Sequence, residues 1–173
     1  MKKTRVLCGI ACLTAALTSS IAQQKTSAVG NWKLDPTQSD FGAEPALKSV
    51  TIIILKDTPQ MLSWRVRLVD DKGQPSSYSW SGPEDGSMHP IIQPGKTAAS
   101  QESARKEADG TLVRHGEEPD GSSFDARSTI SADGNTITDQ IIGKSKDGKE
   151  SRAKYVYHRA SASSPSADKK ATP

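Results

Sequence analysis

The three histidines are the side chains of this chain best suited to bind a metal or to transfer protons. His89, His115 and His158 lie 26 and 43 residues apart, and none belongs to an H-x-H or H-E-x-x-H pair. Zinc sites usually contain such closely spaced pairs. We therefore predict no metal site and place the histidines on strands or at the surface.

Three other patterns could support catalysis or ion binding, and each is incomplete. Gly-Lys-Ser at residues 143–145 matches the end of a phosphate-binding loop, but Thr138 stands where that loop needs a glycine. No serine lies in the G-x-S-x-G turn of a hydrolase nucleophile elbow. Asp133, Asn135 and Asp139 offer oxygen ligands, but their spacing differs from that of a calcium-binding loop. The sequence therefore predicts no catalytic residue, no cofactor and no enzymatic activity.

Aromatic side chains are the remaining candidates for a site. If they face one interior, they could surround a small, partly apolar molecule. The alternative is that they fill the core of a chain of which only 34% is hydrophobic. The candidate ligand-binding residues are Trp64, Tyr78, Trp80, Tyr155 and Tyr157.

The elements that would position these aromatics begin with a β-hairpin over residues 62–80. An Asp-Asp-Lys-Gly turn divides it, and Tyr78 and Trp80 follow with a period of two. Arg65 and Arg67 fall on the opposite face, where we expect solvent. The inward face of the first strand of this hairpin is predicted to carry Leu62, Trp64, Val66 and Leu68.

An earlier strand is predicted over residues 30–35, with Trp32 and Leu34 on one face. The loop that follows is rich in Pro, Gly, Asp and Ser. Phe41 is the residue of this loop that we expect to turn back onto the core.

The most apolar strand spans residues 49–56. Both of its faces are apolar, so we expect it to be covered on both sides, and a turn is predicted at residues 57–60. A short strand at residues 88–92 contains Pro90, which places it at an edge or a bend. Residues 97–106 could form a strand or a helix, and the neighbouring turns favour a strand.

The last third of the chain contains four Asp-Gly pairs, whose aspartates are 11, 13 and 14 residues apart. Asp-Gly is typical of hairpin turns that need positive φ angles. The strands predicted between these turns cover residues 111–117, 123–131, 135–143 and 150–159.

Nine or ten short strands joined by tight turns predict an all-β fold, an antiparallel up-and-down meander. A single sheet of that many strands curls, so we expect it to close into a barrel over residues 30–159. Because large apolar residues are scarce, a partly polar or hollow interior is easier to form than a tightly filled sandwich.

Residues 1–22 have the pattern of an export signal, with a cationic start, an apolar run and small residues before the expected cleavage. Both cysteines, Cys8 and Cys12, lie within it, so the mature chain is predicted to lack thiols; the residues before Cys12 argue against a lipid anchor. We expect a periplasmic or extracellular protein without membrane insertion after cleavage. Residues 23–29 are predicted to be a linker, and residues 160–173 a disordered tail.

The charge of the mature chain is predicted to be balanced. The whole chain carries 23 Lys and Arg against 20 Asp and Glu, and the export signal contains three of the cations and no acid. A balanced, mixed-charge surface argues against nucleic acid or an anionic membrane as a partner.

Gly30-Asn31-Trp32, at the first strand, resembles the G-x-W opening of lipocalins. The wider pattern is similar to small secreted bacterial lipocalin-like proteins of unknown function, which continue with a K-S-V-T strand, here residues 48–51, and a series of Asp-Gly hairpins. The resemblance implies a barrel with Trp32 at its closed end beneath an arginine of the last strand, either Arg152 or Arg159. The chain departs from true lipocalins in lacking their two cysteines and C-terminal helix.

Two functions are consistent with these features. The first is an exported binding module that holds a small, partly apolar ligand between the aromatics. The second is a structural or interaction protein of the cell envelope, with a filled barrel, no ligand and an unidentified protein partner.

Overall fold

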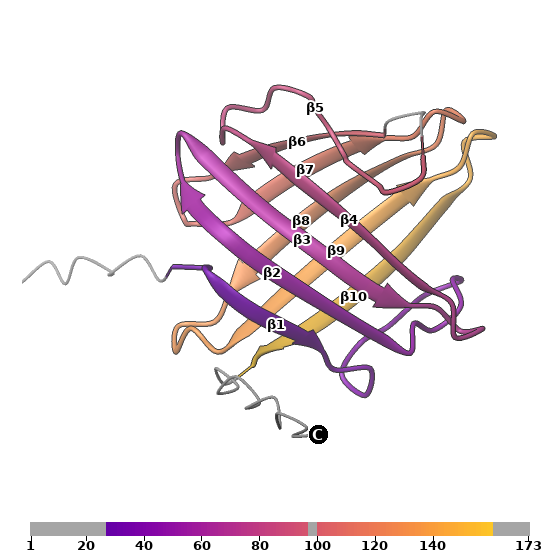
Figure 1. Cartoon of the computed structure of the whole chain (residues 1–173), viewed down its shortest axis with the longest axis horizontal. Helices are drawn as coiled ribbons and strands as arrows, with labels where there is room; N and C mark the ends of the chain where they lie inside the picture. Colours follow the sequence, from indigo (N-terminus) through magenta and orange to yellow (C-terminus); the bar gives the residue numbers. More distant parts are fainter. Residues whose placement is uncertain (1–26, 97–99, 161–173) are drawn as a thin grey trace, which may run out of the picture.

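The computed structural model describes residues 27–96 and 100–160, and it shows ten strands in one antiparallel sheet (Figure 1). The predicted export signal at residues 1–22 and the predicted tail beyond Ala160 lie outside the described residues. The strands are β1 (Gly30–Leu34), β2 (Ser49–Thr58), β3 (Met61–Val69), β4 (Pro75–Gly82), β5 (His89–Pro90), β6 (Gln101–Lys106), β7 (Leu112–Glu117), β8 (Ser123–Ile130), β9 (Thr136–Lys144) and β10 (Glu150–Arg159).

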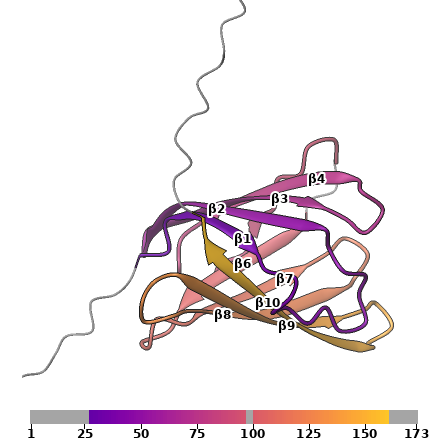
Figure 2. The ribbon, with the colours of Figure 1, turned by 90° about the horizontal axis from the view of Figure 1, so that it is seen from below.

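Consecutive strands pair with each other except β4 and β5, which are the two ends of the sheet, and β1 also pairs with β10. The gap between these ends is bridged where Ser79 of β4 and Ile92, which follows β5, exchange two backbone hydrogen bonds of 2.9 and 2.8 Å. The sheet is therefore a nearly closed up-and-down barrel, which confirms the predicted fold class. Figure 2 shows β2–β4 along one wall of the barrel and β8 and β9 along the opposite wall, and Figure 1 shows that these two walls run in crossing directions. None of the described residues forms a helix that could span a membrane.

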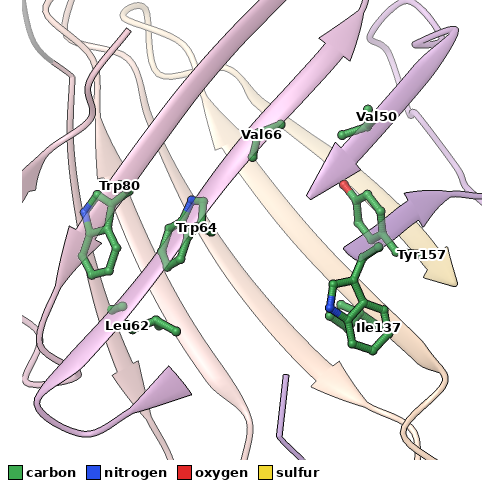
Figure 3. Close-up of a cluster of buried hydrophobic side chains, with 9 residues drawn as sticks. Val50, Leu62, Trp64, Val66, Trp80, Ile137 and Tyr157 are labelled. Atoms are coloured by element: carbon green, nitrogen blue, oxygen red, sulfur yellow. The ribbon is translucent and has the colours of Figure 1, made fainter. Parts of the chain in front are cut away.

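The β3–β4 hairpin has the predicted faces. Trp64 pairs with Trp80 and Val66 with Tyr78, while Arg65 is exposed on the outer side. The two indole rings stack with centroids 4.4 Å apart (Figure 3). This hairpin supplies much of the core, as predicted from its period of two. The buried apolar residues that it contributes are Leu62, Trp64, Val66 and Trp80.

The prediction that β2 is covered on both sides is wrong. Ile52 and Ile54 face the interior, but Leu55 on the other side is 54% exposed. A barrel made of a single sheet has solvent on its outer face, and none of the described segments covers Leu55.

The predicted turn at residues 57–60 is also wrong in its first half, because β2 continues to Thr58. The pairing of β2 with β3 skips Leu55, so this residue forms a β-bulge. The bulge shifts the alternation by one residue. Asp57, rather than Lys56, consequently points into the barrel.

The predicted hairpin turns all occur, although only their glycines have positive φ angles. At the β6–β7 turn, the Gly110 amide donates to the carbonyl of Glu107, and Gly110 has a φ of 89°. This is a type I turn followed by a left-handed glycine, a three-residue connection. Asp109 contributes through its carboxylate, which accepts a hydrogen bond from the Thr111 amide at 2.9 Å.

The ambiguous segment at residues 97–106 is a strand where the structure describes it. β6 covers Gln101–Lys106 and pairs with both β5 and β7. The short strand at His89–Pro90 ends the sheet, as its proline predicted. Phe41 also lies where it was expected, with its ring 5.5 Å from that of Tyr155.

Trp32 is fully buried at one end of the barrel. The Arg159 guanidinium lies over its ring, 4.2 Å from the centroid, and donates to the carbonyls of Ser27, Val29 and Gly134. Arg159 is thus the arginine above Trp32, whereas the side chain of Arg152 is exposed. Residues 27–29, the described part of the predicted linker, pack against the barrel at this end.

Candidate ligand-binding cavity

The interior of the barrel contains a cavity of about 1250 Å³. Side chains from both walls line it, because alternate residues of every strand point inward. This volume exceeds the roughly 300–1,000 Å³ of most pockets for drug-sized ligands, so the cavity has room for one. Its apolar lining includes Ile52, Ile54, Val66, Leu68, Ile137 and Ile141.

Four of the five aromatic residues predicted as ligand-binding line this cavity, namely Trp64, Tyr78, Tyr155 and Tyr157. Trp80 does not. It lies behind Trp64, is 1% exposed, and its indole Nε1 donates to the carbonyl of Glu102 at 2.8 Å. Figure 3 shows Trp64 beside Trp80, with Tyr157 lying further along the same interior. Trp80 therefore supports Trp64 rather than forming part of the cavity surface.

A charged cluster lies among these aromatics in the lining of the cavity, and we call its members Arg114, Glu102 and Asp139 the interior triad. Arg114 on β7 donates from Nη1 to Glu102 Oε1 at 2.9 Å and from Nη2 to Asp139 Oδ2 at 2.6 Å. Ser128 on β8 donates to the other oxygen of Asp139 at 2.8 Å. The guanidinium also lies 5.7 Å from the centroid of the Trp64 ring. The triad thus links β6, β7 and β9 through side chains that line the cavity.

Burial governs the protonation of this cluster. It would lower the pKa of Arg114, but the adjacent Asp139 and Glu102 carboxylates outweigh it and raise that pKa, so the guanidinium stays charged. Burial raises the pKa of Glu102, and the charge of Arg114 only partly opposes this. The Glu102 carboxylate therefore depends on the single guanidinium to remain ionised in a low-dielectric interior.

The tyrosine hydroxyls add neutral polar groups to the cavity wall. Burial raises the pKa of Tyr78, Tyr155 and Tyr157, most strongly for the first and last, so these phenols stay protonated at neutral pH. Tyr157 is only 4% exposed, and no described residue accepts or donates a hydrogen bond at its hydroxyl. A buried hydroxyl next to a cavity is available to a ligand or to water.

A second buried ion cluster lies near the end of the barrel that contains Trp32, because the Ala28 amide donates to Asp57 and the Ala28 carbonyl accepts from Trp32 Nε1. Lys106 forms a hydrogen-bonded ion pair with Asp57 and lies 3.0 Å from Glu84 Oε1. Burial would raise the pKa of Asp57, but hydrogen bonds from Lys106 and from the Ala28 amide lower it overall. The bulge at Leu55 makes this cluster possible because it turns Asp57 inward.

The histidines lie away from the cavity. His115 contacts Asp125 on the outer face, His158 contacts Asp35, and the His89 ring meets the edge of Trp80. Within residues 27–96 and 100–160, no group of three His, Cys, Asp or Glu side chains is arranged to hold a metal ion. Asp133 and Asn135 belong to a hairpin turn, whereas Asp139 belongs to the interior triad.

Sequence reasoning missed the interior triad, although part of its signal is present. Strict alternation places Arg114 on the face of Leu112, Glu102 on the face of Ala104, and Asp139 between Ile137 and Ile141. Three charged residues at inward positions require mutual pairing. The sequence alone does not show which strands bring them together.

Comparisons with known proteins support the fold alone. No protein-family model and no curated protein matches the chain. A mutant of the fluorescent protein UnaG superimposes with a TM-score of 0.52 at 13% identity, over 77% of this chain and 96% of that one. Rv2717c from M. tuberculosis superimposes with a TM-score of 0.53 at 14% identity, over 78% and 93%. Each solved structure matches nearly its whole length to the barrel, so the chain has the fold of these small β-barrels.

Proposed function

We propose that this protein binds a small, partly apolar molecule inside its barrel. The observation that carries the proposal is the cavity of about 1250 Å³, which has apolar and aromatic walls and a few buried polar groups. Sites for small molecules commonly combine a largely apolar lining with a few fixed polar groups. Nothing in the proposal requires catalysis.

The same observation favours binding over the alternative of a filled barrel. Trp64 and the three tyrosines border the cavity without filling it. We further propose that the protein is exported and is related to lipocalin-like proteins, as its sequence predicts. The packing of Arg159 over the buried Trp32 is consistent with that resemblance.

Native mass spectrometry tests this proposal. The mature protein should be purified from an exported preparation without detergent. The expected result is a reproducible additional mass that leaves on denaturation. A bare protein mass, together with no change in tryptophan fluorescence across a panel of lipids and aromatic compounds, would refute ligand binding.

A matched pair of variants locates the ligand. Val66→Phe adds a ring on the inward face of β3, where Val66 lines the cavity, and Arg65→Phe adds the same ring to the outer face of that strand. The additional mass should be lost in Val66→Phe and kept in Arg65→Phe. Equal retention in both variants would place the ligand outside the cavity.

A further inference from the structure

We propose that the cavity selects a ligand with a cationic nitrogen head group, such as an alkyl or aryl ammonium, over a carboxylic acid of the same shape. This inference rests on the proposed function and specifies its ligand class. Its basis is the charge of the cavity lining. The lining acids are Asp57, Glu102, Asp109, Glu118 and Asp139, whereas the lining cations are Lys96, Lys106 and Arg114. The formal charge of the lining is therefore negative.

The one guanidinium among the aromatics is already shared by two carboxylates. Both terminal nitrogens of Arg114 already bind carboxylates, at 2.9 Å to Glu102 and 2.6 Å to Asp139. An incoming carboxylate would be a third anion around this one guanidinium, beside Glu102 and Asp139. This arrangement is unfavourable because excess negative charge in a dry interior is costly.

A cationic ligand would instead be attracted by this cluster. The interior triad has two carboxylates for one guanidinium, so it carries a formal charge of −1 when both acids are ionised. An ammonium beside Glu102 and Asp139 would neutralise that excess and favour their ionised forms. The Lys106 cluster repeats the same stoichiometry, with Asp57 and Glu84 around one ammonium.

The aromatic lining supplies further contacts for a cation. The ring of Trp64 is already taken, because it stacks on Trp80 and has the Arg114 guanidinium 5.7 Å from its centroid, so the rings available to a ligand cation are those of Tyr78, Tyr155 and Tyr157. Tyr157 is buried, and its hydroxyl is unpaired among the described residues, so its oxygen can accept a hydrogen bond from an ammonium. Apolar side chains elsewhere in the cavity would contact a hydrocarbon tail.

Three probes with one tail and different head groups test the inference. Decylamine, decanol and decanoate should each be titrated against the protein preloaded with the neutral dye Nile red, and displacement followed by dye fluorescence at neutral pH. Decylamine should bind at least about tenfold more tightly than decanoate. The reason is that the attraction of a cation and the repulsion of an anion by the same negative site of low dielectric differ in free energy by at least that amount. Equal or tighter binding of decanoate would overturn the inference while leaving the proposed function intact. If neither Nile red nor any of the three probes binds, the proposed function itself fails.

Charge-removing variants identify the residues responsible. Glu102→Gln and Asp139→Asn should each lower the preference for decylamine over decanoate about fivefold or more, because each removes one carboxylate and leaves Arg114 a partner. Asp125→Asn is the matched control, since Asp125 lies on the outer face of β8 with its side chain 71% exposed. An unchanged preference in both interior variants, or an equal change in the control, would overturn the assignment. If Asp139→Asn fails to fold, as judged by circular dichroism, Glu102→Gln alone decides.

Discussion

Replacing Arg114 by Met should destabilise the barrel strongly, because the two buried carboxylates of the interior triad share this one cation. Glu102 is 1% exposed and the side chain of Asp139 is 7% exposed, so water can do little to replace the guanidinium. Removing one partner from a buried ion pair typically costs about 3–5 kcal/mol. That loss is a large part of the roughly 5–15 kcal/mol that stabilises a domain.

The comparison with two further variants separates the lost cation from lost packing. Glu102→Gln leaves the Arg114–Asp139 pair in place and removes a carboxylate whose pKa burial raises, so we expect a change within about 1 kcal/mol. Replacing Glu102, Arg114 and Asp139 together by Leu, Met and Leu removes every charge of the triad. Such apolar replacements are often neutral or stabilising, so this triple variant should be more stable than Arg114→Met.

The assay is urea unfolding followed by tryptophan fluorescence, since all three tryptophans of the chain are buried. It should be run at neutral pH and at about pH 4.5. Burial raises the pKa of Glu102 and Arg114 opposes this, so without Arg114 the folded-state pKa of Glu102 should lie further above its unfolded value of about 4. Stability of the variant is then highest below that pH and is lost as the pH rises through the raised pKa. The deficit relative to the wild type should therefore shrink on acidification.

Two results would refute this reasoning. One is a deficit below about 1 kcal/mol at neutral pH, which would mean that the carboxylates do not depend on Arg114. The other is a triple variant no more stable than Arg114→Met, which would attribute the loss to packing. If Arg114→Met does not fold at neutral pH, folding of the triple variant still distinguishes the two explanations.

Three further predictions concern other parts of the barrel. Burial raises the pKa of all three tyrosines, so absorbance at alkaline pH should show no phenolate near the usual tyrosine pKa of about 10. Above that pH, each fully buried tyrosine should lower the free energy of unfolding by about 1.4 kcal/mol per pH unit. Detection of phenolate at pH 10 in the folded protein would contradict this prediction. Arg159→Ala should cost about 2 kcal/mol in urea unfolding because it removes the cation over Trp32 and three hydrogen bonds, whereas Arg152→Ala should change stability by less than about 0.5 kcal/mol; equal effects would contradict this role. A Cβ on Gly116 would overlap the ring of Phe124, so Gly116→Ala should cost about 1–3 kcal/mol and be partly rescued by Phe124→Leu, and a failure of rescue would contradict the clash.

Alternation in the sequence predicted most of the barrel. The inward faces of β3, β4 and β10 follow from a period of two, because side chains of a strand alternate between its faces. The Asp-Gly pairs located the later turns. Both signals depend only on residues close together in the sequence, so they can be recognised without knowledge of the tertiary contacts.

The features that sequence reasoning missed depend on contacts between distant strands. The bulge at Leu55 reverses the alternation and turns Asp57 inward. Residues 49–58 taken alone contain no pattern that predicts this bulge. The pairing of Arg114 with Glu102 and Asp139 requires knowing which strands face the same interior. The volume of the cavity depends on how the two walls curve, so the sequence could not decide between a hollow and a filled barrel.

Equilibrium titration of the protein with Nile red is the most direct test of a hollow, ligand-binding interior. A saturable transition with one site and blue-shifted emission should appear in the wild type and in Arg65→Phe, and it should be lost in Val66→Phe. Absence of saturable binding in the wild type, or binding that Val66→Phe leaves unchanged, would contradict the binding cavity described above.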